Sequence, residues 1–141
     1  RSLVNYDRLA NCGIWAIFRQ ERVSYFTQDE LRCQCGCGVY LFDEDALSIL
    51  NSIRRDCGFP LPVSSGYRCV KHPIEAAKSK PGAHTTGKAV DLAVNRDQAH
   101  ELLRVAFSHG VPRVGVNQKG DGRFIHLDWC DDRPGPTVWS Y

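Results

Sequence analysis

The sequence predicts an α+β fold in which helices flank an antiparallel sheet. Two segments repeat apolar residues with the helical period, and others alternate apolar and polar residues as strands do. The segments 113–117 and 123–129 are separated by the turn sequence Lys119-Gly120-Asp121-Gly122, a pattern typical of a β-hairpin. Because a hairpin pairs its strands in opposite directions, we expect the sheet to be antiparallel.

The chain length and composition indicate one globular domain. Its 141 residues suffice for a single buried core, and the proportions of apolar (43%) and charged (24%) residues are those of a folded protein. The net charge of +2 is too small, and too evenly spread, to indicate a nucleic-acid partner. No apolar run approaches the length of about 18 residues that a membrane span needs, so we expect no membrane insertion.

Two helices are expected in the first half of the chain. Residues 1–25 are mixed in character and are expected to form an N-terminal extension packed on a domain of residues 26–141. Thr27 and Glu30 have the spacing of a capping box, which predicts a short helix that fails at the following Cys/Gly run. A longer helix is expected between its cap Asp43 and its stop signal Gly58. Its apolar face would contain Ala46, Leu47, Ile49, Leu50 and Ile53.

The second half is expected to supply the strands and one more helix. Residues 61–65 and 88–94 are predicted to be strands, joined by a polar loop. Asn95 is a suitable cap for an amphipathic helix that stops at Gly110, after which the hairpin completes the sheet. In the second hairpin strand, alternation places residues 126 and 128 on one face and residues 125 and 127 on the other.

Three side chains in this half are of the kinds that bind zinc. His84 and Asp91 are seven residues apart, and Gly87 between them allows a sharp turn that brings them together. His126 lies on the predicted strand of residues 123–129. Two neutral imidazoles and one carboxylate form a set typical of catalytic zinc sites, which leave the fourth position to water. The spacing alone also fits a hydrogen-bonded histidine and a loop or helix-capping aspartate, so both interpretations remain open at this point.

The cysteines allow several interpretations. Their number, seven, is odd, so at least one thiol is free or paired outside the chain. The run Cys33-Gln34-Cys35-Gly36-Cys37 suggests a metal site, but structural zinc sites usually present two knuckles with wider spacing. A cysteine-bound metal, disulfides and plain buried thiols therefore remain alternatives. The cysteines are Cys12, Cys33, Cys35, Cys37, Cys57, Cys69 and Cys130.

Three blocks of sequence together resemble a known family. The blocks are Ser64-Ser65-Gly66-Tyr67-Arg68, His84-x-x-Gly87-x-Ala89-x-Asp91 and Phe124-Ile125-His126-Leu127-Asp128. In this order they resemble the zinc D-Ala-D-Ala carboxypeptidase family, over residues 26–139. That family shares its fold with the hedgehog signalling domain and with phage L-alanyl-D-glutamate endopeptidases. The resemblance therefore implies a single domain of the hedgehog/DD-peptidase fold.

The resemblance implies roles for individual residues. It makes His84, Asp91 and His126 the zinc ligands. It also makes Arg68 the arginine that binds the substrate carboxylate or the developing oxyanion, which suits a permanently charged, bidentate guanidinium.

At the position where the family usually carries its general base, this sequence departs from the family pattern. Many members carry an acidic residue three positions before the last ligand, where this sequence has Arg123. We expect Asp128 to serve as the base, with Asp121 as the alternative, although Asp128 could instead orient a ligand.

The surroundings of the site can also be predicted from the resemblance. Cys33 and Cys69 stand where relatives often carry cysteine, which suggests a disulfide near the site. Trp129 and Trp139 flank the site and could form a wall of the cleft.

The resemblance implies a zinc-dependent peptidase that hydrolyses peptide stems of bacterial peptidoglycan. We expect a monomer that acts in the periplasm or the cell wall. Similarity to small phage members suggests an endolysin or a virion-associated lytic enzyme, and a cellular wall-remodelling carboxypeptidase is the near alternative. Because Arg123 occupies the usual base position, a catalytically silent zinc-binding module of the same fold, for example in a phage tail, is the second hypothesis.

Overall fold

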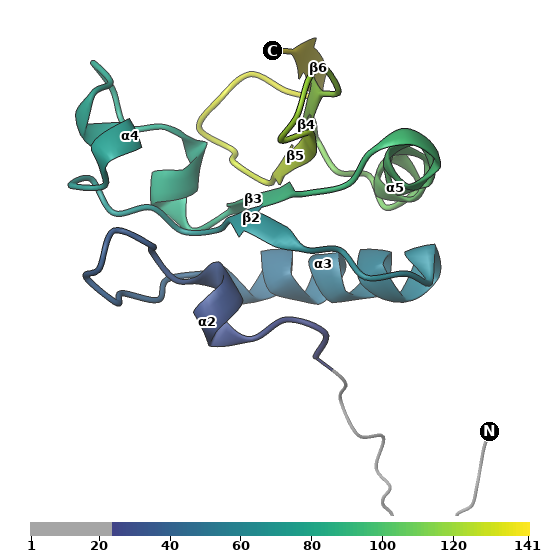
Figure 1. Ribbon diagram of the computed structural model, residues 1–141, viewed down its shortest axis with the longest axis horizontal. Coiled ribbons are helices and arrows are strands. Elements are labelled where there is room, and N and C mark those ends of the chain that lie inside the picture. The colour runs from purple at the N-terminus through teal and green to yellow at the C-terminus, as the bar shows by residue number, and fades with distance from the viewer. Residues whose placement is uncertain (1–23) are drawn as a thin grey trace, which may run out of the picture.

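A five-stranded sheet forms the centre of the computed structural model, which describes residues 24–141 (Figure 1). The strands in spatial order are β2 (Val63–Ser65), β3 (Ala89–Leu92), β5 (Phe124–Asp128), β4 (Arg113–Asn117) and β6 (Thr137–Ser140). The α+β class is therefore confirmed. The predicted N-terminal extension lies, apart from residues 24 and 25, outside the described residues.

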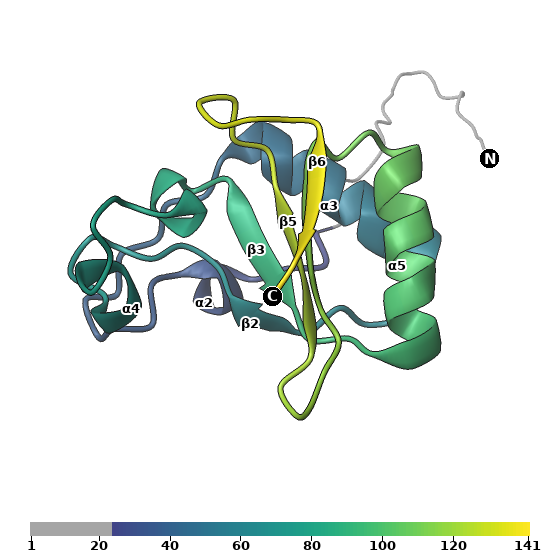
Figure 2. The same ribbon diagram turned by 90° about the horizontal axis from the view of Figure 1, so that it is seen from above.

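The pairing of the strands is antiparallel from β2 to β4, as predicted, and parallel between β4 and β6. The β4–β5 hairpin is present, with Arg113 opposite Asp128 and Asn117 opposite Phe124. Strand β6 was not predicted. The chain turns back after β5 and crosses to the far side of β4, so β6 runs opposite to β5 and hence parallel to β4 (Figure 2).

Two long helices cover one face of the sheet (Figures 1 and 2). Helix α3 (Glu44–Cys57) begins where Asp43 accepts a hydrogen bond from the Ala46 amide, and it ends at Gly58 with a left-handed φ of 76°. Helix α5 (Arg96–Ser108) begins after Asn95, as predicted, although the Asn95 side chain makes no capping hydrogen bond. The predicted short helix is α2 (Gln28–Leu31), in which Thr27 accepts from the Glu30 amide.

Two further short helices lie in the segment predicted to be a polar loop. Helix α4 (Pro73–Ala76) begins with proline at its first position, where no amide hydrogen is needed, and His72 caps it by accepting from the Ile74 amide. The 3-10 helix η1 (Ala83–Thr86) precedes β3. In Figure 2, both lie on one side of the sheet and α5 lies on the opposite side.

The core lies between the sheet and the two long helices. Ile125 and Leu127 of β5 are fully buried in it, which confirms the predicted alternation along this strand. They pack with Val90, Leu92 and Val114 from neighbouring strands and with apolar residues of α3 and α5. The side chains of residues 126 and 128 therefore lie on the opposite face of β5, away from this core. Within residues 24–141, no helix has the length and apolar character needed to cross a membrane.

Candidate functional site

Four residues form a row across the face of the sheet that is turned away from the core. Asp91 of β3 pairs with His126 of β5, His126 pairs with Gly115 of β4, and Gly115 pairs with Trp139 of β6. Since paired residues in adjacent strands point to the same side of a sheet, their side chains share one surface. The site is therefore built on regular strands.

Gly115 gives Trp139 its position in this row. A Cβ atom at Gly115 would lie 2.7–2.9 Å from three atoms of the Trp139 indole, closer than real contacts allow. Because glycine has no side chain, the indole can lie over β4, and its ring centre is 5.3 Å from that of His126. Trp139 thus lines the site as predicted, whereas Trp129 packs against the core and does not line it.

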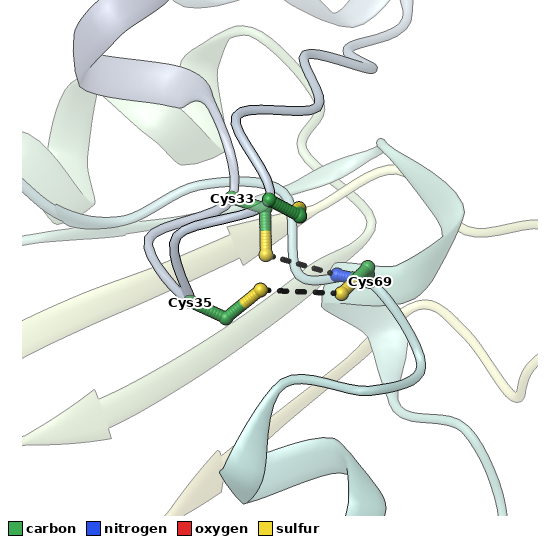
Figure 3. A group of neighbouring side chains, drawn as sticks. Cys33, Cys35 and Cys69 are labelled. Atoms are coloured by element: carbon green, nitrogen blue, oxygen red, sulfur yellow. Dashed lines mark hydrogen bonds between the residues drawn. The ribbon is translucent and has the colours of Figure 1, made fainter.

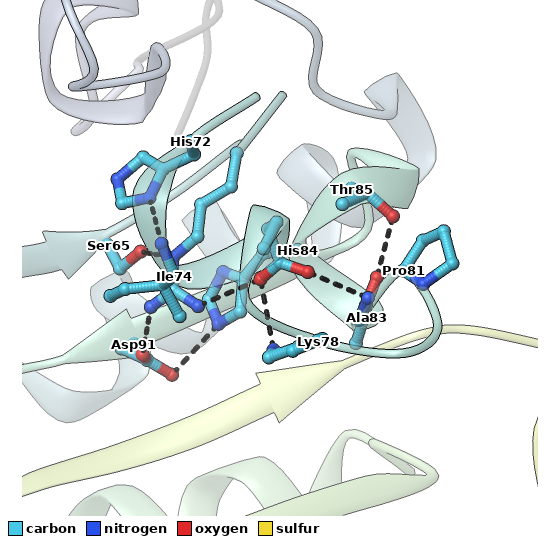
Figure 4. A network of polar contacts seen from close by, with 12 residues as sticks. Ser65, His72, Ile74, Lys78, Pro81, Ala83, His84, Thr85 and Asp91 are labelled. Carbon is cyan, nitrogen blue, oxygen red and sulfur yellow. Dashed lines mark hydrogen bonds and ion pairs between the residues drawn. The ribbon is translucent and has the colours of Figure 1, made fainter. Parts of the chain in front are cut away.

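His84 reaches the row from η1. Gly87, with a left-handed φ of 76°, ends η1 and turns the chain into β3, as the sequence predicted. His84 Nδ1 is 2.7 Å from the Gly66 carbonyl oxygen, so Nδ1 carries the proton and donates it. The other nitrogen, Nε2, faces Asp91 and lies 3.3 Å from its Oδ1 (Figure 4).

His126 has carboxylates at both ring nitrogens. Its Nδ1 is 2.8 Å from Asp91 Oδ1, and its Nε2 is 2.7 Å from Asp128 Oδ2. Burial by itself would lower the pKa of His126, but the hydrogen bonds to Asp128 and Asp91 outweigh it and raise the pKa. Burial would likewise raise the pKa of Asp91, but its bonds to His126 and His84 hold that pKa well below the usual range.

The structure brings all three predicted ligand residues together. One donor atom from each of His84, Asp91 and His126 lies within 4.8 Å of the others, and the three side chains are buried. Two imidazoles and one carboxylate at this spacing are able to hold a metal ion.

Asp128 lies behind His126, fully buried and fully bonded. Its Oδ1 accepts hydrogen bonds from Arg113 Nε at 2.8 Å and from the Cys130 amide at 3.1 Å, while Oδ2 contacts His126. Burial raises the pKa of Asp128 and the bond to His126 lowers it, with a net decrease. These contacts favour an orienting role over that of a general base, because donors within the protein already engage both oxygens.

Arg113 is a site residue that the sequence reasoning missed. A signal for it existed, because the predicted hairpin register places residue 113 opposite residue 128. Its guanidinium also lies over the Trp139 ring, 5.0 Å from the ring centre. Arg113 therefore supports both the aspartate and the aromatic wall.

Arg68 extends along β3 beside Asp91. Its Nη2 is 3.7 Å from Asp91 Oδ2, and its Nε donates to Ser65 Oγ at 2.9 Å. Two residues before it, Gly66 passes so close to α2 that a Cβ would lie 2.6 Å from the Leu31 carbonyl oxygen. The Ser-Gly-Tyr-Arg block therefore needs glycine at this position to bring Arg68 to the site.

Glu75, on α4, is a second residue that the sequence reasoning missed. It is only 4% exposed and accepts from Arg68 Nη1 at 3.1 Å, Lys78 Nζ at 3.0 Å and the Gly82 amide at 2.8 Å. Burial would raise the pKa of Glu75, but these three donors lower it. Figure 4 shows Lys78 in this network. The proline at the start of α4 could have indicated a helix here, but nothing in the sequence pointed to Glu75 as a partner of Arg68.

A cavity of about 380 Å³ opens over these residues. Among the described residues, its lining contains four basic side chains and only two carboxylates, Asp91 and Asp128. The alternative base Asp121 does not line it, and Arg123 instead donates to the Gly120 carbonyl oxygen in the hairpin turn. The basic residues are Arg68, Lys78, Arg113 and Arg133, and the large apolar residues are Phe124, Trp139 and Tyr141.

The suggested disulfide between Cys33 and Cys69 is absent, because both residues are free thiols. The Cys69 amide donates to Cys33 Sγ at 3.3 Å, whereas Cys69 Sγ faces Cys35 Sγ at 3.5 Å. The Sγ–Sγ distance between Cys69 and Cys35 is itself much longer than a covalent S–S bond of about 2.05 Å, so Cys69 is not bonded to Cys35 either. The two residues do approach each other, but without the predicted bond.

Comparison with known proteins identifies the family. The family model described as Peptidase M15 matches residues 24–128, about three quarters of the chain. No curated protein matches the sequence significantly. The matched range includes His84, Asp91, His126 and Arg68, so the family assignment and the site geometry refer to the same part of the molecule. This chain belongs to the Peptidase M15 family.

Proposed function

We propose that the protein is a zinc-dependent peptidase that hydrolyses the peptide stems of bacterial peptidoglycan. The observation that carries the proposal is the convergence of His84, Asp91 and His126 at the base of a basic cavity in a chain of the Peptidase M15 family. A D-Ala-D-Ala carboxypeptidase and a stem endopeptidase are both compatible with it, because the residues at the site suit hydrolysis of either bond.

The donor set suits zinc. His84 Nδ1 contacts the Gly66 carbonyl oxygen, and His126 Nε2 contacts Asp128. The remaining ring nitrogens, His84 Nε2 and His126 Nδ1, face Asp91 and can bind a metal as neutral imidazoles. Three protein donors are typical of catalytic zinc sites, whereas structural sites use four. Bound there, zinc supplies Lewis acidity, which lowers the pKa of water and polarises a peptide carbonyl.

The basic lining supports a peptide substrate that carries carboxylates. Stem peptides end in a carboxylate, and Arg68, Lys78 and Arg133 offer cationic donors around the cavity. Arg68 is held by Glu75 and Ser65 at one side and lies near Asp91 at the other, so it is positioned before substrate arrives. We assign it the binding of the substrate carboxylate or of the developing oxyanion.

Asp128 is proposed to position His126 rather than to move a proton in the reaction. By accepting from His126 Nε2, it fixes the ring orientation and leaves Nδ1 facing Asp91. Arg113 and the Cys130 amide hold the carboxylate in place through its other oxygen.

A second candidate function follows from the carboxylates of the cavity. In residues 24–141 the only carboxylates lining it are Asp91 and Asp128, and both are engaged by histidines. A module of this fold that binds zinc and the cell wall without hydrolysing it, for example in a phage tail, is consistent with that arrangement.

The site of action is proposed from the same substrate. A protein that acts on stem peptides would work in the periplasm or the cell wall, either as a phage endolysin or as a cellular wall-remodelling enzyme, and we propose that it does so as a monomer. The proposal is tested by incubating the protein with purified peptidoglycan.

The decisive experiment is mass spectrometry of purified peptidoglycan, from several wall types, after incubation with the zinc-loaded protein. We expect new stem fragments whose masses name the cleaved bond. The His126→Ala variant should release none, and His100→Ala, which changes an exposed histidine of α5, should release as many as the unmodified protein. Binding to the wall without cleavage, by folded and zinc-replete protein, would favour the second candidate.

A further inference from the structure

Four cysteines from two separate loops meet at one point of the surface. Cys33, Cys35 and Cys37 lie in the loop after α2, and Cys69 follows Arg68 in the loop after β2. Their four sulfur atoms all lie within 4.8 Å of one another. Figure 3 shows Cys33, Cys35 and Cys69 converging from the two loops.

The spacing of the sulfur atoms fits a tetrahedral metal site. A zinc ion with Zn–S bonds of about 2.3 Å places its four sulfurs about 3.8 Å apart. Cys35 and Cys69 have Sγ atoms 3.5 Å apart, and no pair in the cluster exceeds 4.8 Å. Four ligands within this range need only small rotamer adjustments to surround one ion.

Core packing does not account for the cluster. Cysteine usually occurs buried as a small apolar side chain, yet Cys35 and Cys37 are exposed and Cys69 is half-buried. All four are free thiols. Cys33 alone is buried, and the exposed thiols beside it contribute little to a core, whereas metal ligands are often held by short loops.

The loop around the cysteines has the features of a ligand-binding knuckle. The Cys33 amide donates to the Val39 carbonyl oxygen at 2.9 Å, which closes the loop on itself. The Val39 amide donates to Cys37 Sγ at 3.4 Å, and the Cys69 amide donates to Cys33 Sγ at 3.3 Å. Amide groups directed at sulfur stabilise thiolate ligands.

We infer that Cys33, Cys35, Cys37 and Cys69 bind one zinc ion in a structural site, separate from the His84–Asp91–His126 site. With four protein ligands the site is closed and has no position for substrate, so its role is to stabilise the fold. It joins the end of α2 to the segment that carries Arg68, whose amide donates to the His84 carbonyl oxygen at 3.1 Å. The inference does not depend on peptidase activity.

The test is the zinc content of the full chain, expressed with zinc and purified under a non-thiol reductant. We expect two zinc ions per chain by elemental mass spectrometry. The Cys35→Ser/Cys37→Ser double variant, which changes exposed side chains, should retain one ion, and so should His126→Ala. Combining the three substitutions should leave none. Cys57→Ser, at the end of α3 and outside the cluster, is the matched control and should keep two.

Cobalt replacement identifies the ligands of each ion. In the unmodified chain and in His126→Ala, cobalt should produce the intense near-ultraviolet absorption of a thiolate-to-metal charge transfer. This band should disappear in the Cys35→Ser/Cys37→Ser variant. The inference is wrong if the unmodified chain holds one zinc ion or fewer and this content does not change in the cysteine variant. It is also wrong if the cluster contains iron instead of zinc.

Discussion

The two groups of side chains that could bind a metal in the described part of this molecule are built in opposite ways. His84, Asp91 and His126 are buried, and two of them lie on adjacent strands whose hydrogen bonds fix their relative positions. The cysteine cluster lies on two loops and is partly exposed. The first group has three donors beneath a cavity, while the second has four donors and none of its members lines that cavity.

This difference indicates different roles. A site with three donors leaves room for water and substrate, and its geometry has to be held by surrounding residues such as Asp128 and Gly66. A site with four donors is complete, so the ion itself holds the loops together. Hydrolysis would thus take place at the three-donor site on the sheet, whereas the two cysteine loops would depend on a metal ion for their stability.

The largest effect is expected from variants of the two metal-ligand groups, one of which should lose activity and the other stability. His126→Ala should lower peptidase activity on the order of 1,000-fold, because it removes a zinc ligand and with it several kcal/mol of transition-state stabilisation. Cys35→Ser/Cys37→Ser should keep activity within about threefold at low temperature while lowering the Tm by about 10 °C, equivalent to roughly 3 kcal/mol. Initial rates and thermal unfolding of both variants measure the contrast. Equal losses of activity in the two variants would contradict it.

Asp128→Asn tests whether the sheet site depends on its supporting residues. The amide that replaces the carboxylate cannot accept hydrogen bonds from both His126 and Arg113, so the imidazole loses its fixed orientation. We expect zinc affinity and activity to fall by about 10- to 100-fold. Zinc titration and initial rates measure these quantities, with Asp121→Asn in the exposed turn as control. A general base at Asp128 would instead abolish activity without weakening zinc binding.

Glu75→Gln acts on the residue that links Arg68 to α4. The change leaves the largely enclosed guanidinium of Arg68 without the Glu75 carboxylate, and we expect the free energy of unfolding to fall by about 2 kcal/mol at pH 7. The pKa of Glu75 is lowered on folding from an ordinary value of 4.5, so the unfolded chain binds the proton more readily. Its contribution is therefore complete above pH 4.5 and is lost as the pH falls through the folded pKa.

Denaturant unfolding of both proteins across this pH range is the measurement for Glu75. The difference in unfolding free energy should shrink below pH 4.5 and stay constant above it. Glu101→Gln, in the solvent-exposed ion pair with Arg104, should show a much weaker dependence, because water screens that pair and its contribution to stability is small. A constant difference at every pH would assign the effect to packing instead of charge.

The smallest effect is expected at Gly115. A methyl group there would contact the Trp139 indole and displace it from His126. We expect Gly115→Ala to cost about 1 kcal/mol of stability and to change the near-ultraviolet circular dichroism of the tryptophans. An unchanged spectrum would show that the indole does not need the space left by the glycine.

Much of the fold could be predicted because its signals are local. Asp43 and Gly58 mark the two ends of α3, and the turn of residues 119–122 sets the register of the β4–β5 hairpin. The alternation that buries Ile125 and Leu127 places His126 and Asp128 on the other face. Helix capping, turn chemistry and strand alternation each depend on a few neighbouring residues, so a single sequence contains them.

The features that could not be predicted depend on contacts between distant segments. Strand β6 pairs in parallel with β4 only after the chain has crossed the sheet, and a four-residue strand has little pattern of its own. The ion pair of Arg68 with Glu75 likewise joins two segments whose proximity follows from packing. The expected disulfide was wrong for the same reason, because Cys35 lies opposite Cys69.

The sequence by itself determined the α+β class, the order of the main elements and the residues of the candidate metal site, since these follow from local periodicity and from family motifs. The tertiary structure decided which groups share a surface. It brought Glu75 to Arg68, and it gathered four cysteines from two loops. The physical reason is that hydrogen bonding and metal coordination require atoms within a few ångströms, and only the packed chain brings distant residues that close.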